Sequence, residues 1–234
     1  MTNLVTVLEA EIVVDDPGAI ENDNMYYREI GERLVQIRHY LVSAIAKTER
    51  FGSHDMLVMK IGLPIEEGAI NCVYHGNLER SSAIRDDEQT RSAMIEDLKT
   101  SHNPEMHTRS VRVQLQFVCD GMVDQPELRP SHIKTVIEDD EDPNIGEEID
   151  SFPIQITQEG TLDHSAIQEV IVTLQDEGKG FEEDKVVDPT DPDYIERNHG
   201  RGLLLMRAFM DRVEYSDGGR LVALSKIAEL HENS

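Results

Sequence analysis

The chain has 234 residues, 38% of them apolar, which is enough for one domain with a buried core. Its formal net charge of −25 argues against nucleic acid as a partner, because the phosphates would be repelled; solubility and a basic protein partner each account for the charge. There is no signal peptide and no long apolar run, and both cysteines lie in apolar segments, so we expect a cytoplasmic protein with reduced thiols and no membrane contact.

Residue periodicity divides the first half of the chain into four elements and one polar segment. Residues 4–14 are rich in β-branched residues (Val5, Val7, Ile12, Val13 and Val14), which predicts a strand. Apolar steps of three and four residues predict a helix over 25–47 with one apolar stripe, and a second helix is predicted over 54–76. The polar segment 80–107 contains a short predicted helix, and strict alternation over 111–119 predicts a half-buried strand.

The second helix carries a candidate polar site. Glu67 and Asn71 stand four residues apart and therefore share one helix face. Such a pair can hold a metal ion through the amide oxygen while the carboxylate orders a water or a hydroxyl, or it can simply form a surface hydrogen bond. Pro64 should kink or restart the helix one turn before Glu67, and Gly76 is expected to end it in the left-handed conformation.

An acidic stretch separates the strand at 111–119 from the next one. Between residues 120 and 165 there are thirteen Asp and Glu residues against two basic ones, Arg129 and Lys134. This composition predicts an insertion between two strands with a mobile acidic tip at 138–150. Two interpretations remain open, a solvated loop or a docking surface for a partner.

The last third of the chain predicts a strand, a loop, a helix and a hairpin. The strand at 166–175 leads to Asp176, and Pro189 and Pro192 keep the segment 182–199 out of regular structure. A helix is predicted over 203–210, and two short strands around the turn Asp217-Gly218-Gly219 close the sheet.

Two glycine clusters in this third suggest a nucleotide site. Asp176 at a strand end can accept a hydrogen bond from the amino group of a base, and Gly178 and Gly180 let a ligand lie against bare backbone, although such a sequence is also a common turn. Gly200 and Gly202 stand at the start of a helix, whose unpaired N–H groups suit phosphate.

Together these motifs resemble the GHKL ATPase and kinase superfamily, and most closely its anti-sigma-factor serine kinases. The resemblance covers about residues 25–79 and 108–226. It rests on Glu66-Glu67-Gly68-Ala69-Ile70-Asn71, Tyr74-His75-Gly76-Asn77, Asp176-x-Gly178-x-Gly180, Asp188-Pro189-Thr190-Asp191-Pro192 with Glu196-Arg197, and the stretch from Gly200-Arg201-Gly202-Leu203 through Met206-Arg207 to Met210-Asp211.

The resemblance implies one α+β domain, a two-layer α/β sandwich with a mixed, mainly antiparallel sheet and helices on one face. It implies ATP and Mg²⁺ as cofactors, with 182–199 as a lid over the phosphates and Glu67 as the base that takes a proton from a serine or threonine hydroxyl. Asn71 would hold the Mg²⁺ and Asp176 the adenine. The remaining nucleotide contacts would come from Gly178, Gly180, Gly200, Arg201, Gly202 and Leu203.

The implied partners are an anti-sigma antagonist as the protein substrate, a sigma factor, or both, with a homodimer also possible. One departure from the pattern is Ala223, because related kinases carry a threonine near the end of the last strand whose hydroxyl reaches the adenine. We therefore expect weakened ATP binding, by about 1 kcal/mol. The alternative is a nucleotide-binding switch or sequestering protein without phosphoryl transfer. A histidine kinase is disfavoured because only 66 residues precede Glu67, and a gyrase- or mismatch-repair-type ATPase because no transducer domain follows.

Overall fold

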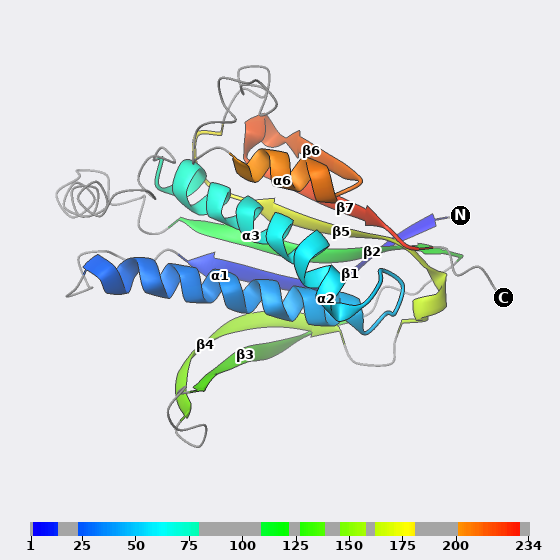
Figure 1. The fold of residues 1–234 in the computed structure, drawn as a ribbon, viewed down its shortest axis with the longest axis horizontal. Coiled ribbons are helices and arrows are strands. Elements are labelled where there is room, and N and C mark those ends of the chain that lie inside the picture. The colour runs from blue at the N-terminus through cyan, green and yellow to red at the C-terminus, as the bar shows by residue number, and fades with distance from the viewer. Residues whose placement is uncertain are drawn as a thin grey trace.

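The computed structural model describes residues 2–13, 23–79, 109–121, 127–138, 146–157, 162–180 and 201–229. These residues form an open antiparallel sheet with helices packed on one of its faces (Figure 1). The expected helical segment at 80–107, the expected lid at 182–199 and Gly200 lie outside the described residues.

Seven strands make up the sheet, in the order β3-β4-β1-β2-β5-β7-β6. Every pairing in the described part of the chain is antiparallel, so the α+β class is confirmed while the expected mixture of strand directions is not seen there. The strands are β1 (Thr2–Val13), β2 (Ser110–Asp120), β3 (Leu128–Glu138), β4 (Gly146–Thr157), β5 (Ile167–Gln175), β6 (Arg212–Ser216) and β7 (Leu221–Ile227).

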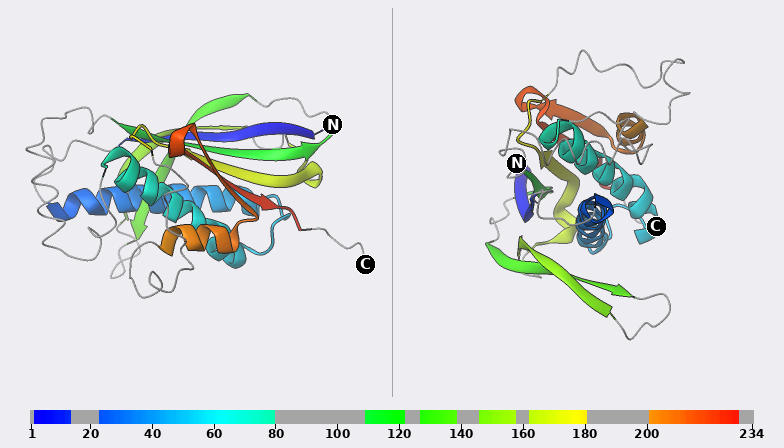
Figure 2. Two further views of the ribbon diagram at one scale, coloured as in Figure 1. Left: turned by 90° about the horizontal axis from the view of Figure 1, so that it is seen from above. Right: turned by 90° about the vertical axis from the view of Figure 1, so that its left-hand side faces the viewer.

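The helices form the second layer. Seen from above and from the side, they lie on the same face of the central strands (Figure 2). They are α1 (Asp23–Ala46), the continuous helical run of α2 (His54–Leu57), η2 (Val58–Gly62), α3 (Leu63–Ile70) and η3 (Asn71–Asn77), and α6 (Arg201–Phe209). Two short 3₁₀ turns, His164–Ala166 and Asp217–Gly219, complete the regular structure described.

The second helix is wound differently on either side of Pro64. This proline stands in the first turn of α3, directly after the π-helical turn η2. Since proline has no N–H to donate and its ring crowds the preceding turn, a widened turn is where it is tolerated. The helix thus changes from π to α winding at Pro64 and continues as one run, so the expected restart one turn before Glu67 is not seen. The expected left-handed end at Gly76 is wrong, because η3 runs on through Asn77 and the positive φ falls at Glu79 (φ 52°).

Strand register separates an apolar face from a polar one. Ala10, Val113, Leu174 and Val222 are paired in turn across four strands and are all buried beneath the helical layer. The neighbouring row, one residue along each strand, consists of Glu9, Gln114, Thr173 and Ala223 and lies on the opposite face. On that face the Gln114 amide donates to Glu9 (2.7 Å) and accepts from the Thr173 hydroxyl (3.4 Å).

The acidic insertion contains a β-hairpin. β3 and β4 pair with each other along almost their whole length, whereas β4 pairs with β1 only from Ala10↔Ile154 to Leu8↔Ile156. The hairpin therefore leaves the central sheet after a short junction, as Figure 1 shows below α1. Glu138 and residues 146–150 belong to its strands, so the expected tip at 138–150 is too long; residues 139–145 lie outside the described part.

Candidate functional site

The candidate site begins where β5 ends. Asp176 is buried, with 7% of its surface exposed, and its backbone N–H donates to the carbonyl of Arg220 (2.9 Å). Its carboxylate oxygen Oδ1 accepts from the backbone N–H of Gly178 (2.8 Å). Burial raises the pKa of Asp176 to about 6, although the Gly178 hydrogen bond and the charges of Arg220 and Arg109 act in the opposite direction. The carboxyl group is thus held in a defined place while its charged form is disfavoured.

The end of η3 lies directly against this carboxylate. A Cβ added at Gly76 would fall closer than 3.0 Å to all three atoms of the Asp176 carboxylate, and one added at Gly178 would meet the backbone carbonyl of Gly76 equally closely. The two glycines therefore pack backbone to backbone, and neither position has room for a side chain. The Cys72 thiol, one turn earlier, also lies beside Asp176; burial first, then this carboxylate, raises the pKa of the thiol well above its usual range.

Gly180 packs on the turn between β6 and β7. It has a positive φ of 71°, and a Cβ there would overlap the carbonyl oxygen of Gly218. Both its conformation and its surroundings require glycine. The three motif positions Asp176, Gly178 and Gly180 are thus held between the helix end on one side and the hairpin turn at Asp217–Gly219 on the other.

Glu67 and Gly202, which are 135 residues apart in sequence, are in contact. A Cβ added at Gly202 would lie 2.5 Å from Oε2 of Glu67, so the Glu67 carboxylate rests on the first turn of α6. A carboxylate at a helix start is favoured by the unpaired N–H groups and by the dipole. The neighbouring Glu66 points elsewhere and forms an ion pair with Arg38 of α1.

Asn71 follows Glu67 by one helical turn. Its backbone N–H donates to the Glu67 carbonyl, so the two residues have α-helical spacing, and its side chain is half-buried. Among the described residues there is no group of three or more His, Cys, Asp or Glu side chains that could hold a metal ion. A divalent cation at Asn71 would therefore take most of its ligands from a bound nucleotide and from water.

The second glycine cluster is described only in part. Gly202 and the backbone of Arg201 lie in the first turn of α6, and Leu203 is partly buried against the hydrophobic core, so its side chain supports the helix. Gly200 and the Arg201 side chain lie outside the described part of the chain. The structure thus brings Glu67 into contact with the start of α6. Asp176 lies against Gly76, near the C-terminal end of the helical run that also carries Glu67.

The expectation attached to Ala223 requires correction. Ala223 is paired with Thr173 on the sheet face opposite the helices, whereas its neighbours Val222 and Leu224 are buried beneath them. Asp176 continues the alternation of Val172 and Leu174 and thus belongs to the helical side. A hydroxyl at position 223 would point away from Asp176. The alanine therefore gives no reason to expect weaker nucleotide binding.

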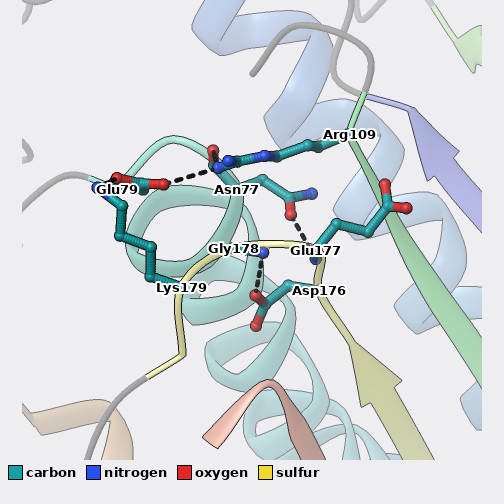
Figure 3. Close-up of polar contacts among 7 residues, drawn as sticks. All are labelled: Asn77, Glu79, Arg109, Asp176, Glu177, Gly178 and Lys179. Carbon is teal, nitrogen blue, oxygen red and sulfur yellow. Dashed lines mark hydrogen bonds and ion pairs between the residues drawn. The ribbon is translucent and has the colours of Figure 1, made fainter. Parts of the chain in front are cut away.

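A polar network behind the Asp176 loop was missed by the sequence reasoning (Figure 3). Asn77 accepts from the backbone N–H of Glu177 (2.9 Å), and Arg109 donates to the carbonyl of Asn77 (2.9 Å) and to Glu79 (3.0 Å). Lys179 completes it with an ion pair to Glu79. Burial raises the pKa of Glu79, but hydrogen bonds from Lys179 and Arg109 outweigh it, so the net pKa lies below the usual range. In the sequence, only the motif His75-Gly76-Asn77 pointed to this network.

The comparisons with known proteins agree with this arrangement. Residues 146–226 match a family model described as Histidine kinase-like ATPase domain. The matched stretch contains Asp176 and both glycine clusters, and it begins after the helix that carries Glu67 and Asn71. It supports a GHKL-type ATPase domain; such domains bind ATP, usually with Mg²⁺. No curated protein and no solved structure matches the chain.

Within the described ranges, no helix combines the length and the apolar character that crossing a membrane requires.

Proposed function

We propose that this protein is an ATP-dependent serine/threonine protein kinase of the anti-sigma-factor type. Its protein substrate would be an anti-sigma antagonist, and it would regulate transcription by modifying that protein, by holding a sigma factor, or by both. The match over residues 146–226 supports the coarser part of this proposal, an ATP-binding regulatory protein of the GHKL type with kinase or ATPase activity.

The observation that carries the proposal is the contact between Glu67 and Gly202. A helix start offers unpaired N–H groups to the phosphates of a nucleotide, and the Glu67 carboxylate is in contact with that helix start. A base placed there would be next to the terminal phosphate and could take the proton of an incoming hydroxyl. The same glycine is needed for both roles, since any side chain at 202 would displace the carboxylate.

Recognition of the base falls to the Asp176 loop. An ionised Asp176 accepts a hydrogen bond from the 6-amino group of adenine, and its burial makes that bond selective because few waters can replace the ligand. Gly178 and Gly180 let this loop pack closely against Gly76 and Gly218, and this packing holds Asp176 in place. The backbone N–H groups at Gly200, Arg201, Gly202 and Leu203 would hold the phosphates, and Arg201 would contribute its charge.

The residues fit a Mg²⁺ ion bound together with the nucleotide. Mg²⁺ in nucleotide sites is held by one or two protein oxygens, the phosphates and several waters, and the half-buried Asn71 amide can supply one such oxygen. When bound, the ion neutralises phosphate charge during transfer. Asn71 orients it, and Glu67, one turn earlier, holds the proton taken from the hydroxyl.

Calorimetric titration with ATP, with and without Mg²⁺, tests the site. Wild-type protein should bind ATP, Asp176→Asn should lose the binding, and Asn71→Ala should bind with little dependence on Mg²⁺. No binding by wild type at millimolar ATP would refute the proposal.

The slow formation of ADP from ATP by the same preparations tests the chemistry. Glu67→Gln should bind ATP but lose turnover by at least about 100-fold, whereas the matched control Glu66→Gln, which changes the neighbouring carboxylate, should keep both. ATP binding without measurable turnover in wild type would instead favour the nucleotide-binding switch.

A further inference from the structure

We propose that Asn77 is a positioning residue for base recognition, which fixes the place of the Asp176 carboxylate and thereby the preference for a purine with a 6-amino group. This inference rests on the proposed function, because it takes Asp176 as the residue that reads the base. The observation behind it is the fully buried Asn77 side chain, which bonds to the backbone of the loop that carries Asp176.

The loop is fixed by hydrogen bonds on consecutive residues. The Asp176 N–H donates to the carbonyl of Arg220 (2.9 Å), the residue just before β7. The Gly178 N–H donates to the Asp176 carboxylate (2.8 Å). The N–H between them, that of Glu177, donates to Oδ1 of Asn77 (2.9 Å). Without this acceptor, the peptide that links Asp176 to Glu177 loses its hydrogen bond to the helix end.

Asn77 is suited to this role by its place in the helix. It follows Gly76, whose missing side chain makes room for the Asp176 carboxylate. One residue thus provides the space and the next provides the hydrogen bond, and both come from the last turn of η3. If the peptide between Asp176 and Glu177 rotated, the Asp176 carboxylate would move from its place beside Gly76. Its orientation toward a base would then change.

A second layer of contacts holds Asn77 and Glu177 in turn. Arg109 donates to the Asn77 carbonyl (2.9 Å), and the Glu177 carboxylate accepts from the backbone N–H of Ser110 (2.7 Å) at the start of β2. Helix end, loop and strand start are therefore joined at one point, as Figure 3 shows for Arg109, Asn77 and Glu177.

The oxygen of the Asn77 amide is the atom that acts on the loop. Its Nδ2 is buried and has no hydrogen-bond partner among the described residues, so its loss removes no described interaction. Aspartate keeps an oxygen at the same position, whereas leucine fills a similar volume without an acceptor. Comparing asparagine, aspartate and leucine at position 77 therefore separates the effect of the hydrogen bond from the effect of packing. Aspartate also introduces a buried charge, which lowers stability on its own account.

The experiment measures the preference for ATP over purine riboside triphosphate, which differs only by lacking the 6-amino group. Calorimetric titration of wild type with both nucleotides should give a preference of at least about tenfold, the usual value of one hydrogen bond to a charged group. In Asn77→Leu the preference should fall below about threefold, mainly through weaker ATP binding. Asn77→Ala removes the same oxygen by truncation and is measured alongside in case leucine does not fit.

Two controls separate positioning from stability. Asn77→Asp should lower the melting temperature yet keep the preference within about twofold of wild type. Leu78→Ala, a cavity at the next buried residue, should also lower the melting temperature and leave the preference unchanged. An Asn77→Leu or Asn77→Ala variant that selects ATP as well as wild type does would overturn the role of Asn77 alone. Wild-type protein that binds neither nucleotide would overturn the proposed function, and this role with it.

Discussion

Replacing Asp176 by asparagine should make the nucleotide-free protein more stable while removing ATP binding. Burial raises the pKa of Asp176 from 3.8 to about 6, so the folded state disfavours the carboxylate that the unfolded chain carries freely. Asparagine has nearly the same shape and keeps an oxygen for the Gly178 N–H, which now donates to Oδ1 at 2.8 Å. The substitution therefore removes a buried charge and keeps the loop hydrogen bond.

The size of the effect follows from the pKa shift. A difference of about two pKa units corresponds to about 3 kcal/mol between the charged and neutral forms. This cost is absent below pH 3.8, where the group is protonated in both states, grows as the pH rises through the interval to about 6, and is constant above it. Since asparagine does not reproduce every contact, we expect a gain of about 1–3 kcal/mol at pH 7, or about 3–9 °C in melting temperature.

Urea unfolding of wild type and Asp176→Asn between pH 4 and pH 8 measures this directly. The quantity that matters is the difference in unfolding free energy between the two proteins, because the other acidic residues titrate in both and cancel. That difference should be about 2 kcal/mol larger at pH 7 than at pH 4, with most of the rise complete by about pH 6.5. A difference that does not depend on pH, or a destabilised variant at pH 7, would refute the reasoning.

Three further predictions concern the glycines and the last strand. Gly178→Ala should lower stability by at least about 2 kcal/mol in urea unfolding, because its Cβ would overlap the backbone carbonyl of Gly76, which no side-chain rotation relieves; a loss below 0.5 kcal/mol would contradict this packing. Gly202→Ala should stay within about 1 kcal/mol of wild type but lower ATP turnover more than ATP affinity, since only the end of the Glu67 side chain has to move; equal losses would argue against that contact. Ala223→Thr should leave the dissociation constant for ATP within about twofold, because position 223 lies on the far face of the sheet; tighter binding would show that the hydroxyl reaches the base.

Periodicity in the sequence predicted the elements that carry the site. The helix predicted over 25–47 is α1, and the strands predicted at 111–119 and 166–175 are β2 and β5, each within one or two residues of its observed bounds. These elements have one buried face each, and a buried face leaves a regular apolar pattern. The glycine motifs were expected to leave room for a ligand and to begin a phosphate-binding helix, and ligand binding at them stays a prediction. That Gly76 packs against Asp176 and Gly178, and Gly202 against Glu67, is a finding of the structure.

The contacts that depend on strand register, or that join segments far apart in the chain, could not be predicted from the sequence. Ala223 was placed next to the base by its position in a motif, but its side is decided by the burial of Val222 and Leu224, and a shift of one residue reverses the face. Asn77 meets Glu177 across 100 residues, and a lone asparagine after a helical stretch has no pattern to mark it. The β3–β4 hairpin was likewise hidden, because its strands are rich in charge and interrupted by proline.

The ion pair between Glu79 and Arg109 has a consequence for how the chain between them can vary in length. These two residues flank positions 80–108, and the bond between them fixes both ends of that stretch at one place beside the Asp176 loop. The entropy cost of closing a chain segment rises only with the logarithm of its length, about 0.6 kcal/mol for each doubling. Insertions and deletions between the two residues are therefore expected to change the free energy of unfolding little and to leave the geometry at Asp176 unchanged.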